Sequence, residues 1–385
     1  MLLGGHNQRQ KKMIHVSLYN KIMLEKITIK NFKSIVAIEL DLGRVNVFIG
    51  ENGCGKTNIL EAIAVGSAAT ANKLDKEFLR SRGIRANTPK MMKSLFETEN
   101  KSDKIEITMK NSHSIRNKVI IQNHSEKPNN FVSTYKIDID ENDEEHYIAE
   151  EDTSFYSPEI EMSNFLIYAP ENYFLRRFEE EGQITPLGVH GEGLFQHLVE
   201  IYRRNPELLA KISEKLKLID WFQGFEIPTD LLFTERRINI KDRFLENLSN
   251  LDSLNYFDQR SANEGFLYLL FYFTLLMSNE TPSFFAVDNI DNGLNPKLCA
   301  ELIRNISNLS KEHKKQVILT THNPAILDGL DLYDNEQRLF TIYRNGDGHT
   351  KVRRIIPKPV VKGIETVRNS EAYIRGYLGG LPKNF

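Results

Sequence analysis

Apolar and polar residues alternate with two different periods along the first part of the chain. From Leu24 the segment LEKITIKNFKSIVAIEL alternates at period two, which is typical of half-buried strands. The apolar run VNVFIG then enters a glycine-rich turn. The following TNILEAIAVGSAA changes to helical spacing, and its apolar face is formed by Ile59, Leu60, Ile63 and Ala64. The pattern therefore predicts early strands and then a strand, a loop and a helix in succession.

The middle of the chain shows two further patterns. Between about residues 104 and 148, the short alternating runs KIEITMK, KVIIQN and STYKIDID are separated by polar clusters and indicate an antiparallel sheet or hairpins. The acidic tract DIDENDEEHYIAEED is expected to cap one hairpin as a solvated turn. Region 191–255 has helical spacing that is broken at Pro206, which predicts a helical lobe.

The last third of the chain alternates between helices and strands. Helical spacing covers 262–277, an apolar strand covers 283–287, a second helix covers 296–309, and a second strand covers 316–320. This βα order predicts a parallel sheet.

One glycine-rich turn has the residues of a phosphate-binding loop. GENGCGKT fits the pattern G-x-x-x-x-G-K-S/T and lies between the predicted strand and helix. Its glycines let backbone amides approach phosphate oxygens at the positive end of the helix. We expect Lys56, on an exposed loop, to reach the β and γ phosphates and the Thr57 hydroxyl to hold Mg²⁺. The predicted nucleotide-binding residues of the loop are Gly50, Asn52, Gly53, Cys54, Gly55, Lys56, Thr57 and Asn58.

Two later strands end in residues that suit the same site. FFAVD delivers Asp288 to the carboxyl end of its strand, where ligands bind in open α/β sheets, and this carboxylate would complete the Mg²⁺ site. A strand that ends in aspartate is weak evidence alone, but it becomes strong when a phosphate-binding loop lies about 230 residues upstream. VILTTHNP ends a third strand. A lone histidine is more often structural, but at this strand end we expect His322 to point at the γ phosphate.

Four segments together resemble a known family. LEKITIKNFKSI, GENGCGKTNILEAI, VDNIDNGLNP and LTTHNPAIL, in this order, are similar to the ABC-type ATPases of the RecF, SMC and OLD group, in the AAA branch rich in prokaryotic defence proteins. The resemblance covers about residues 24–330. It implies an α/β fold in which an ABC-type P-loop ATPase head has a mixed or parallel sheet, an antiparallel β subdomain and a helical lobe. It also implies ATP and Mg²⁺ as cofactors.

The same resemblance implies an oligomer. RSANEGFLYLL falls where the group has its signature sequence, so Ser261, Ala262, Asn263 and Glu264 match the signature position by position. In the family this turn contacts the γ phosphate held by the other protomer. A homodimer or higher oligomer with paired ATP sites is therefore implied.

Two positions depart from the family pattern. The family places its catalytic glutamate directly after the magnesium aspartate, whereas this chain has Asn289. An amide cannot accept a proton from water, and loss of a general base costs roughly 10² to 10⁴ in rate. Asp291 would share the side-chain direction of Asn289 if the strand continued, but roughly 6 to 7 Å further along. In LIYAPEN, Glu171 or Asn172 would stand in for a metal-contacting glutamine of the relatives.

Composition and charge narrow the partners and the compartment. The 385 residues are 40% hydrophobic and 26% charged, as in globular proteins, and a net charge of −2 gives no overall attraction to nucleic acid or membranes. The two cysteines, Cys54 and Cys299, imply no disulfide framework and fit a reducing cytoplasm. The longest apolar stretch, 266–277, is too short to span a bilayer.

These patterns divide the chain into six predicted regions. The first lacks the apolar core of a signal peptide and is expected to be disordered. The regions are an N-terminal extension (1–23), the first part of the ATPase core (24–103), an antiparallel β subdomain (104–165), a helical lobe or insertion (166–255), the second part of the core with signature, Asp288 and His322 (256–345), and a C-terminal packing or partner-docking element (346–385).

The functional hypothesis follows from the motifs and from what accompanies them. About 60 residues follow His322 without acidic residues clustered on strand ends, so we do not expect the nuclease domain of OLD-type relatives. We expect an ATP-binding regulatory subunit with slow or weak ATPase activity that dimerises around ATP and controls a separate effector. The resemblance to ATPase components of anti-phage systems, such as PtuA of Septu, implies an HNH-like nuclease as that effector and contact with nucleic acid through the complex.

Two other functions are weighed against this one. A RecF-like DNA-binding repair ATPase would use a basic face to bind duplex DNA, with steep salt dependence. A metabolic or transport ATPase fits least, because the sequence has no membrane-coupling segment.

Overall fold

The core sheet in this computed structural model has five parallel strands and one antiparallel edge strand. In spatial order the strands are β15 (Thr350–Ile355), β14 (Gln337–Arg344), β3 (Val45–Ile49), β13 (Gln316–Thr321), β12 (Phe284–Val287) and β8 (Ile167–Tyr168). The structure describes residues 23–85, 89–96, 104–112, 115–123, 131–141, 144–147, 164–179, 182, 184–228, 236–245, 256–357 and 367–381. β3, β12 and β13 are buried along their whole length, as expected for parallel strands covered on both faces.

A second six-stranded sheet is antiparallel. Its spatial order is β2 (Ile35–Asp41), β1 (Leu24–Phe32), β4 (Ile105–Asn111), β5 (Ile115–Asn123), β6 (Phe131–Glu141) and β7 (Glu144–Tyr147). β4 to β7 are antiparallel, as predicted for this region, and because β1 pairs with β2 on one edge and with β4 on the other, these strands extend the N-terminal hairpin. Pairing with β4 covers an edge of β1 that would otherwise be open.

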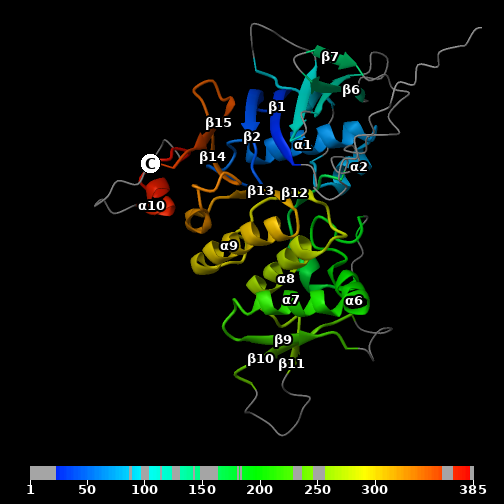
Figure 1. Cartoon of the computed structure of the whole chain (residues 1–385), viewed down its shortest axis with the longest axis vertical. Helices are drawn as coiled ribbons and strands as arrows, with labels where there is room; N and C mark the ends of the chain where they lie inside the picture. The colour runs from blue at the N-terminus through cyan, green and yellow to red at the C-terminus, as the bar shows by residue number, and fades with distance from the viewer. Residues whose placement is uncertain are drawn as a thin grey trace, which may run out of the picture.

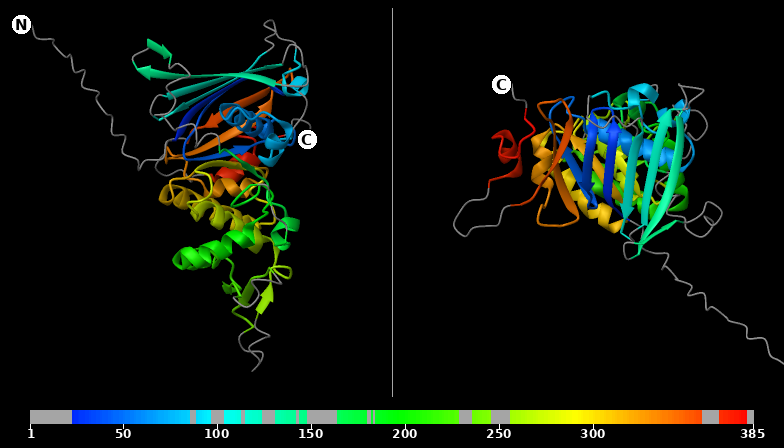
Figure 2. Two further views of the ribbon diagram at one scale, coloured as in Figure 1. Left: turned by 90° about the vertical axis from the view of Figure 1, so that its right-hand side faces the viewer. Right: turned by 90° about the horizontal axis from the view of Figure 1, so that it is seen from above.

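Helices fill the space between and below the sheets. The longest are α1 (Lys56–Thr70), α6 (Leu194–Arg204), α7 (Pro206–Leu216), α8 (Glu264–Met277) and α9 (Pro296–Glu312). Figure 1 shows α1 between the two sheets, α8 and α9 below the core sheet, and α6 and α7 below those. Figure 2 shows the same layers from the side. A small sheet of β9 (Phe222–Glu226), β10 (Asn239–Asp242) and β11 (Tyr256–Asp258) lies at the lower end.

The period-two alternation of β3 separates two hydrophobic clusters. Val45, Val47 and Ile49 pack with α8, α9 and the lower helices. Phe48 faces the other way and packs with α1 and the antiparallel sheet. The strand that precedes the glycine-rich loop is therefore fixed from both sides.

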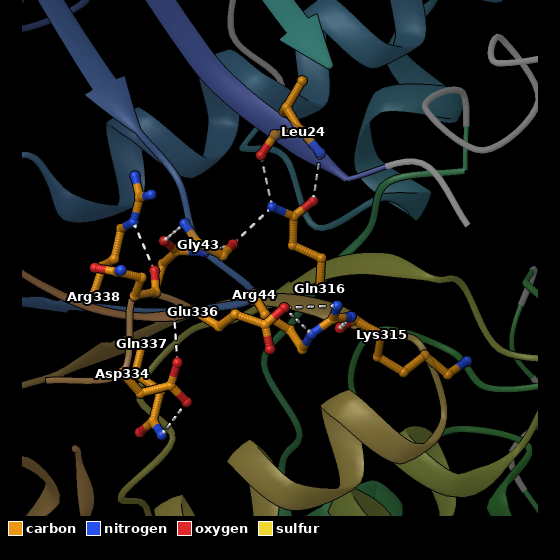
Figure 3. A network of polar contacts seen from close by, with 11 residues as sticks. Leu24, Gly43, Arg44, Lys315, Gln316, Asp334, Glu336, Gln337 and Arg338 are labelled. Atoms are coloured by element: carbon orange, nitrogen blue, oxygen red, sulfur yellow. Dashed lines mark hydrogen bonds and ion pairs between the residues drawn. The ribbon is translucent and has the colours of Figure 1, made fainter. Parts of the chain in front are cut away.

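The amino end of the core sheet is joined to the antiparallel sheet by hydrogen bonds (Figure 3). The side-chain amide of Gln316, at the start of β13, donates to the carbonyl oxygens of Leu24 (2.7 Å) and Gly43 (2.8 Å) and accepts from the Leu24 N–H (2.9 Å). Arg44 forms an ion pair with Glu336 at 3.0 Å. One buried side chain thus ties the first strand of the upper sheet to the centre of the lower one.

Two predicted region boundaries meet a different structure. β8 lies in the predicted helical lobe, yet it is an edge strand of the core sheet. The hairpin of β14 and β15 spans the boundary predicted at 345/346. The helical pattern breaks at Pro206 as predicted: α6 ends at Arg204, and Pro206 begins α7, which Asn205 caps by accepting from the Leu208 N–H. Residues 1–22 lie outside the described part. Within that part, every helix is too short or too polar to cross a bilayer.

Candidate nucleotide-binding site

The glycine-rich loop joins the end of β3 to the start of α1. Gly53 and Gly55 have φ angles of 75° and 109°, which glycine adopts without strain. A methyl group on Gly50 would lie 2.1 Å from the carbonyl oxygen of Ile342, and one on Gly55 would lie 2.1 Å from Thr350 Oγ1. No side chain of the described residues caps α1, so its first amides are available to an anion.

Lys56 is buried inside the loop, which corrects the expectation that it is exposed. Only 5% of the residue is accessible, and burial lowers the pKa of its ammonium group. Nζ donates to the carbonyl oxygens of Gly50 (2.8 Å) and Glu51 (3.1 Å) and lies 3.4 Å from His322 Nδ1. The Lys56 ammonium therefore contacts both the phosphate-binding loop and the residue that follows β13.

The two predicted magnesium ligands lie together. Thr57 Oγ1 donates to Asp288 Oδ2 at 3.1 Å, and the Thr320 hydroxyl donates to the other carboxylate oxygen. The backbone N–H of Asp288 donates to the Tyr168 carbonyl oxygen at 2.8 Å, which fixes the end of β12 against β8. Hydroxyl and carboxylate oxygens are hard donors that suit Mg²⁺. The glycine loop, the uncapped α1 and this oxygen pair fit a magnesium nucleotide.

The chain turns sharply after Asp288 instead of continuing β12. Asn289 has a φ of 56°, a left-handed conformation that asparagine adopts more readily than most residues, and its N–H donates to Thr320 Oγ1 at 2.9 Å. Asp291 is turned back toward β13, where its carboxylate accepts from the Thr321 hydroxyl at 2.6 Å. The extended spacing of 6 to 7 Å assumed for Asp291 therefore does not apply.

His322 follows β13 directly and faces Lys56. Burial lowers the pKa of the imidazole, Lys56 lowers it further, and Asp291 acts in the opposite direction. The ring is therefore neutral at pH 7 and has one N–H to donate. Figure 1 shows that β12 and β13, which carry these residues, run side by side in the core sheet.

The signature turn lies apart from the loop of its own chain. Ser261, Asn263 and Glu264 are exposed, and Asn263 caps α8 by accepting from the Phe266 N–H at 2.8 Å. In the part of the chain that the structure describes, no hydrogen bond joins these three residues to 50–58. Ala262 is buried in the lower cluster.

The segment after β8 contacts the signature turn and not the metal ligands. Asn172 Nδ2 donates to Glu264 Oε1 at 2.7 Å, and Asn172 Oδ1 accepts from Arg176 Nε at 2.8 Å. Glu171 lies 3.4 Å from His190 Nδ1. In the described structure no hydrogen bond joins either residue to Thr57 or Asp288, and the expectation that one of them stands in for the glutamine stays a prediction.

Several residues of the site were missed by the sequence reasoning. Thr320 positions both Asp288 and Asn289, and the doubled threonine before His322 was the available signal. Ser34 accepts from the Asn58 amide at 2.7 Å and lies 2.7 Å from Thr350 Oγ1, which in turn donates to the Cys54 carbonyl oxygen at 2.9 Å.

A cavity of about 580 Å³ opens beside the phosphate-binding loop. The cationic residues that line it are Lys33, Arg85, Lys93 and Arg344.

The last described residues also reach the loop. The Tyr373 hydroxyl donates to the Gly380 carbonyl oxygen at 3.2 Å, and Thr341 Oγ1 donates to that of Leu378 at 3.0 Å. A methyl group on Gly380 would lie 3.7 Å from the Cα atom of Gly50.

This fold and site define an ABC-type P-loop ATPase of the RecF and SMC kind. A family model described as "AAA domain, putative AbiEii toxin, Type IV TA system" matches residues 45–328, which is more than half of the chain, and the chain belongs to this family.

Curated relatives match over a short segment. The DNA replication and repair protein RecF of Listeria welshimeri is 42% identical over 59 residues, which cover 14% of this chain and 16% of that protein. An uncharacterized protein of Methanocaldococcus jannaschii is 36% identical over 77 residues, covering 18% of this chain and 35% of its own length. The chain thus spans about a sixth of the RecF relatives that it matches.

Solved structures match over most of the chain. An SMC head bound to the C-terminal winged-helix domain of ScpA has a TM-score of 0.56 at 15% identity, covering 86% of this chain and 97% of that one. The Pyrococcus furiosus Smc head with an extended coiled coil, bound to the C-terminal domain of ScpA, has a TM-score of 0.55 at 13% identity, covering 87% and 96%. The predicted fold class is confirmed as an SMC head-like α/β fold.

Proposed function

We propose that this protein is an ATP-binding subunit with slow ATPase activity that controls a separate effector, an HNH-like nuclease, in anti-phage defence. The observation that carries the proposal is Asn289, which directly follows Asp288, where the resemblance implies a glutamate as general base, and which lies in a left-handed turn next to Thr320. Without that base, hydrolysis should be roughly 10² to 10⁴ slower than in relatives that have it. A long-lived nucleotide state suits a switch.

Each residue of the site has a role in this proposal. The backbone amides at the start of α1 and the Lys56 ammonium would bind the phosphates of ATP. Thr57 and Asp288 would hold Mg²⁺, which neutralises phosphate charge. Neutral His322 would donate a hydrogen bond to a γ-phosphate oxygen, because its pKa is lowered. Asp291, bonded to Thr321, would order the turn.

A second copy of the chain would complete the site. The exposed Ser261, Asn263 and Glu264 share no hydrogen bond with the phosphate-binding loop in the described structure, which supports contact with the nucleotide of a partner. ATP with Mg²⁺ should then strengthen association, and Ser261→Arg should prevent this. Light scattering of both variants with and without nucleotide tests the idea. An identical assembly in all four samples would mean that ATP does not drive dimerisation.

Two observations support control of a partner protein. The family description includes a putative toxin of a type IV toxin–antitoxin system, and the similar SMC heads were solved bound to ScpA. Purification with the products of neighbouring genes, followed by mass measurement of the complex, would identify an effector. Recovery of the ATPase alone, with and without ATP, would contradict the proposal.

Turnover measurements test the switch itself. Wild-type protein should bind ATP and hydrolyse it at a rate roughly 10² to 10⁴ below the 1 to 100 s⁻¹ of phosphoryl-transfer enzymes. Asn289→Glu should raise turnover, whereas Asp291→Ala should change it little. Fast wild-type hydrolysis that collapses in Asp291→Ala would instead identify Asp291 as the base.

RecF-like DNA binding is the alternative function. It is favoured by the 42% identity with RecF over 59 residues. Binding of duplex DNA by the isolated protein, with a steep dependence on salt concentration, would support it. Absence of such binding at low salt would leave the partner-controlling function.

A further inference from the structure

A second cluster of ligand-type side chains lies at the amino end of the core sheet, away from the nucleotide site. His197 and Glu200 belong to α6, and Glu280 belongs to the segment that joins α8 to β12. One ligand atom from each residue lies within 4.8 Å of the other two. The cluster therefore spans the boundary between the lower helices and the core sheet.

The imidazole of His197 points into this cluster without a hydrogen-bond partner on one side. Its side chain is fully buried, Nδ1 has no hydrogen-bond partner, and the nearest carboxylate atom, Glu280 Oε2, is 3.7 Å away. A buried polar atom without a partner costs free energy. A buried nitrogen without a partner beside two carboxylates distinguishes this cluster from an ordinary acidic surface.

The hydrogen bond on the other side of the ring leaves Nδ1 as the nitrogen that faces the cluster. The Ser278 hydroxyl lies 2.9 Å from Nε2 and suits a hydrogen bond from the Nε2–H. In that tautomer Nδ1 turns its lone pair toward the Glu280 carboxylate, which is the arrangement of a metal-ligating imidazole oriented by a hydrogen bond on its other nitrogen.

We propose that His197, Glu200 and Glu280 bind one divalent transition-metal ion of the Zn²⁺ type. The His-x-x-Glu spacing places the two α6 ligands on one helix face. Ligand atoms about 2.0–2.2 Å from a tetrahedral ion lie about 3.3–3.6 Å apart, close to the 3.7 Å between Nδ1 and Oε2. An imidazole among the ligands favours Zn²⁺ over Mg²⁺ or Ca²⁺. Ser278 would orient the ring from behind.

The site is open to solvent and largely preformed. The side chains of Glu200 and Glu280 are 39% and 46% exposed, so an ion can reach them from solvent, and Glu280 also lines a cavity of about 510 Å³. The backbone N–H of Glu280 donates to Ser278 Oγ at 3.2 Å. The Lys315 ammonium donates to the carbonyl oxygen and to the hydroxyl oxygen of the neighbouring Thr281, which fixes this segment. The metal would therefore join α6 to the far end of α8, whose first turn contains Glu264 of the signature.

Arg204 is the competitor for the two carboxylates. Its guanidinium lies 2.8 Å from Glu200 and 3.5 Å from Glu280, but 70% of its side chain is exposed. Exposed ion pairs contribute little stability, so a metal ion can displace this one. Removal of Arg204 should therefore strengthen metal binding, an effect opposite to that of removing a ligand.

Calorimetric titration of the full chain with Zn²⁺ tests the proposal. Nucleotide-free, chelator-treated Asp288→Asn protein serves as background, so that the magnesium site does not contribute. One Zn²⁺ should bind per chain and raise the melting temperature. Glu280→Gln and Glu200→Gln should each weaken binding at least 10-fold, and Arg204→Gln should tighten it. Glu214→Gln, in an exposed ion pair on α7, is the matched control and should change nothing.

Three results would overturn the site. These are no binding of Zn²⁺, equal binding in both carboxylate variants, and displacement of Zn²⁺ by a modest excess of Mg²⁺. His197→Asn adds a third ligand variant, but the two glutamate variants decide the question even if it fails to fold.

Discussion

Two buried lysines at opposite ends of the core sheet differ in how their charges are satisfied. Lys315 precedes β13 at the amino end, is completely inaccessible, and donates to Thr281 O, Thr281 Oγ1 and Pro282 O at 2.8, 2.9 and 3.1 Å. Lys56 follows β3 at the carboxyl end and donates to two backbone carbonyls and, at 3.9 Å, to Cys54 Sγ, with His322 Nδ1 at 3.4 Å. An ammonium has three hydrogens to donate.

The difference separates a structural charge from one that can serve a ligand. The three oxygens around Lys315 belong to a loop that it holds in place. Lys56 lies beside Asp288 and His322, and the uncapped first turn of α1 opens next to it. Lys315 thus stabilises a loop at the amino end of the sheet, whereas Lys56 at the carboxyl end can bind an anion.

Replacement of Lys315 should have the largest effect on stability. In Lys315→Met, the buried oxygens of Thr281 and Pro282 lose their donor, so we expect a loss of about 3–5 kcal/mol in the free energy of unfolding. Urea denaturation measures it. Lys311→Met, at an exposed position on α9, should change stability by less than about 0.5 kcal/mol. A loss below about 1 kcal/mol for Lys315→Met would contradict the structural role.

Replacement of Lys56 should affect binding and leave stability nearly unchanged. In Lys56→Met the affinity for ATP should fall at least about 100-fold, or about 2.7 kcal/mol, because the charge serves phosphate. The free energy of unfolding should change by less than about 1 kcal/mol, because removal of the buried ammonium also removes its desolvation cost, which offsets the hydrogen bonds that are lost. Calorimetry with ATP and urea denaturation measure the two quantities. Unchanged ATP affinity would refute the assignment of the phosphate-binding loop.

Asp288 should affect only the metal-dependent part of binding. Asp288→Asn should weaken ATP binding in Mg²⁺ about 10-fold more than in chelator, a difference of about 1.4 kcal/mol. The titration in chelator is the internal control. An equal loss of ATP affinity in Mg²⁺ and in chelator would mean that Asp288 has a structural role and does not bind the metal.

The smallest expected effect is a change in a histidine pKa. Burial is the largest cause that lowers the pKa of His322, and the charge of Lys56 is the second largest. Lys56→Met should therefore raise the pKa of His322, so that the imidazole takes up its proton at a higher pH. NMR titration of the imidazole signal measures this. His197 is the control, because burial is the main cause of its pKa of about 4 and Lys56 is not among the causes. A His322 pKa that does not change would mean that Lys56 does not act on it.

The parts of the molecule that sequence could predict are those set by local rules. The strand after residue 283 and the helix that begins at Pro296 follow from apolar runs and from the cap at Asn295. The meeting of Thr57 and Asp288 follows from the rule that carboxyl ends of parallel strands share one edge.

The parts that sequence could not predict depend on distant residues. The left-handed turn at Asn289 depends on Thr320, and the burial of Lys56 depends on carbonyl groups of its own loop and on His322. The pairing of β1 with β4 is likewise decided by an open edge and not by any local signal.

The central position of β3 has a consequence for how the protein is made. Its partners β13 and β14 are synthesised about 270 and 290 residues after it, a delay of about 15–60 s at roughly 5–20 residues per second. During that time the five residues VNVFI have both edges unpaired and neither apolar face covered by the finished core. We therefore expect the strand that supports the phosphate-binding loop to stay exposed to chaperones at the ribosome until the last third of the chain has been made.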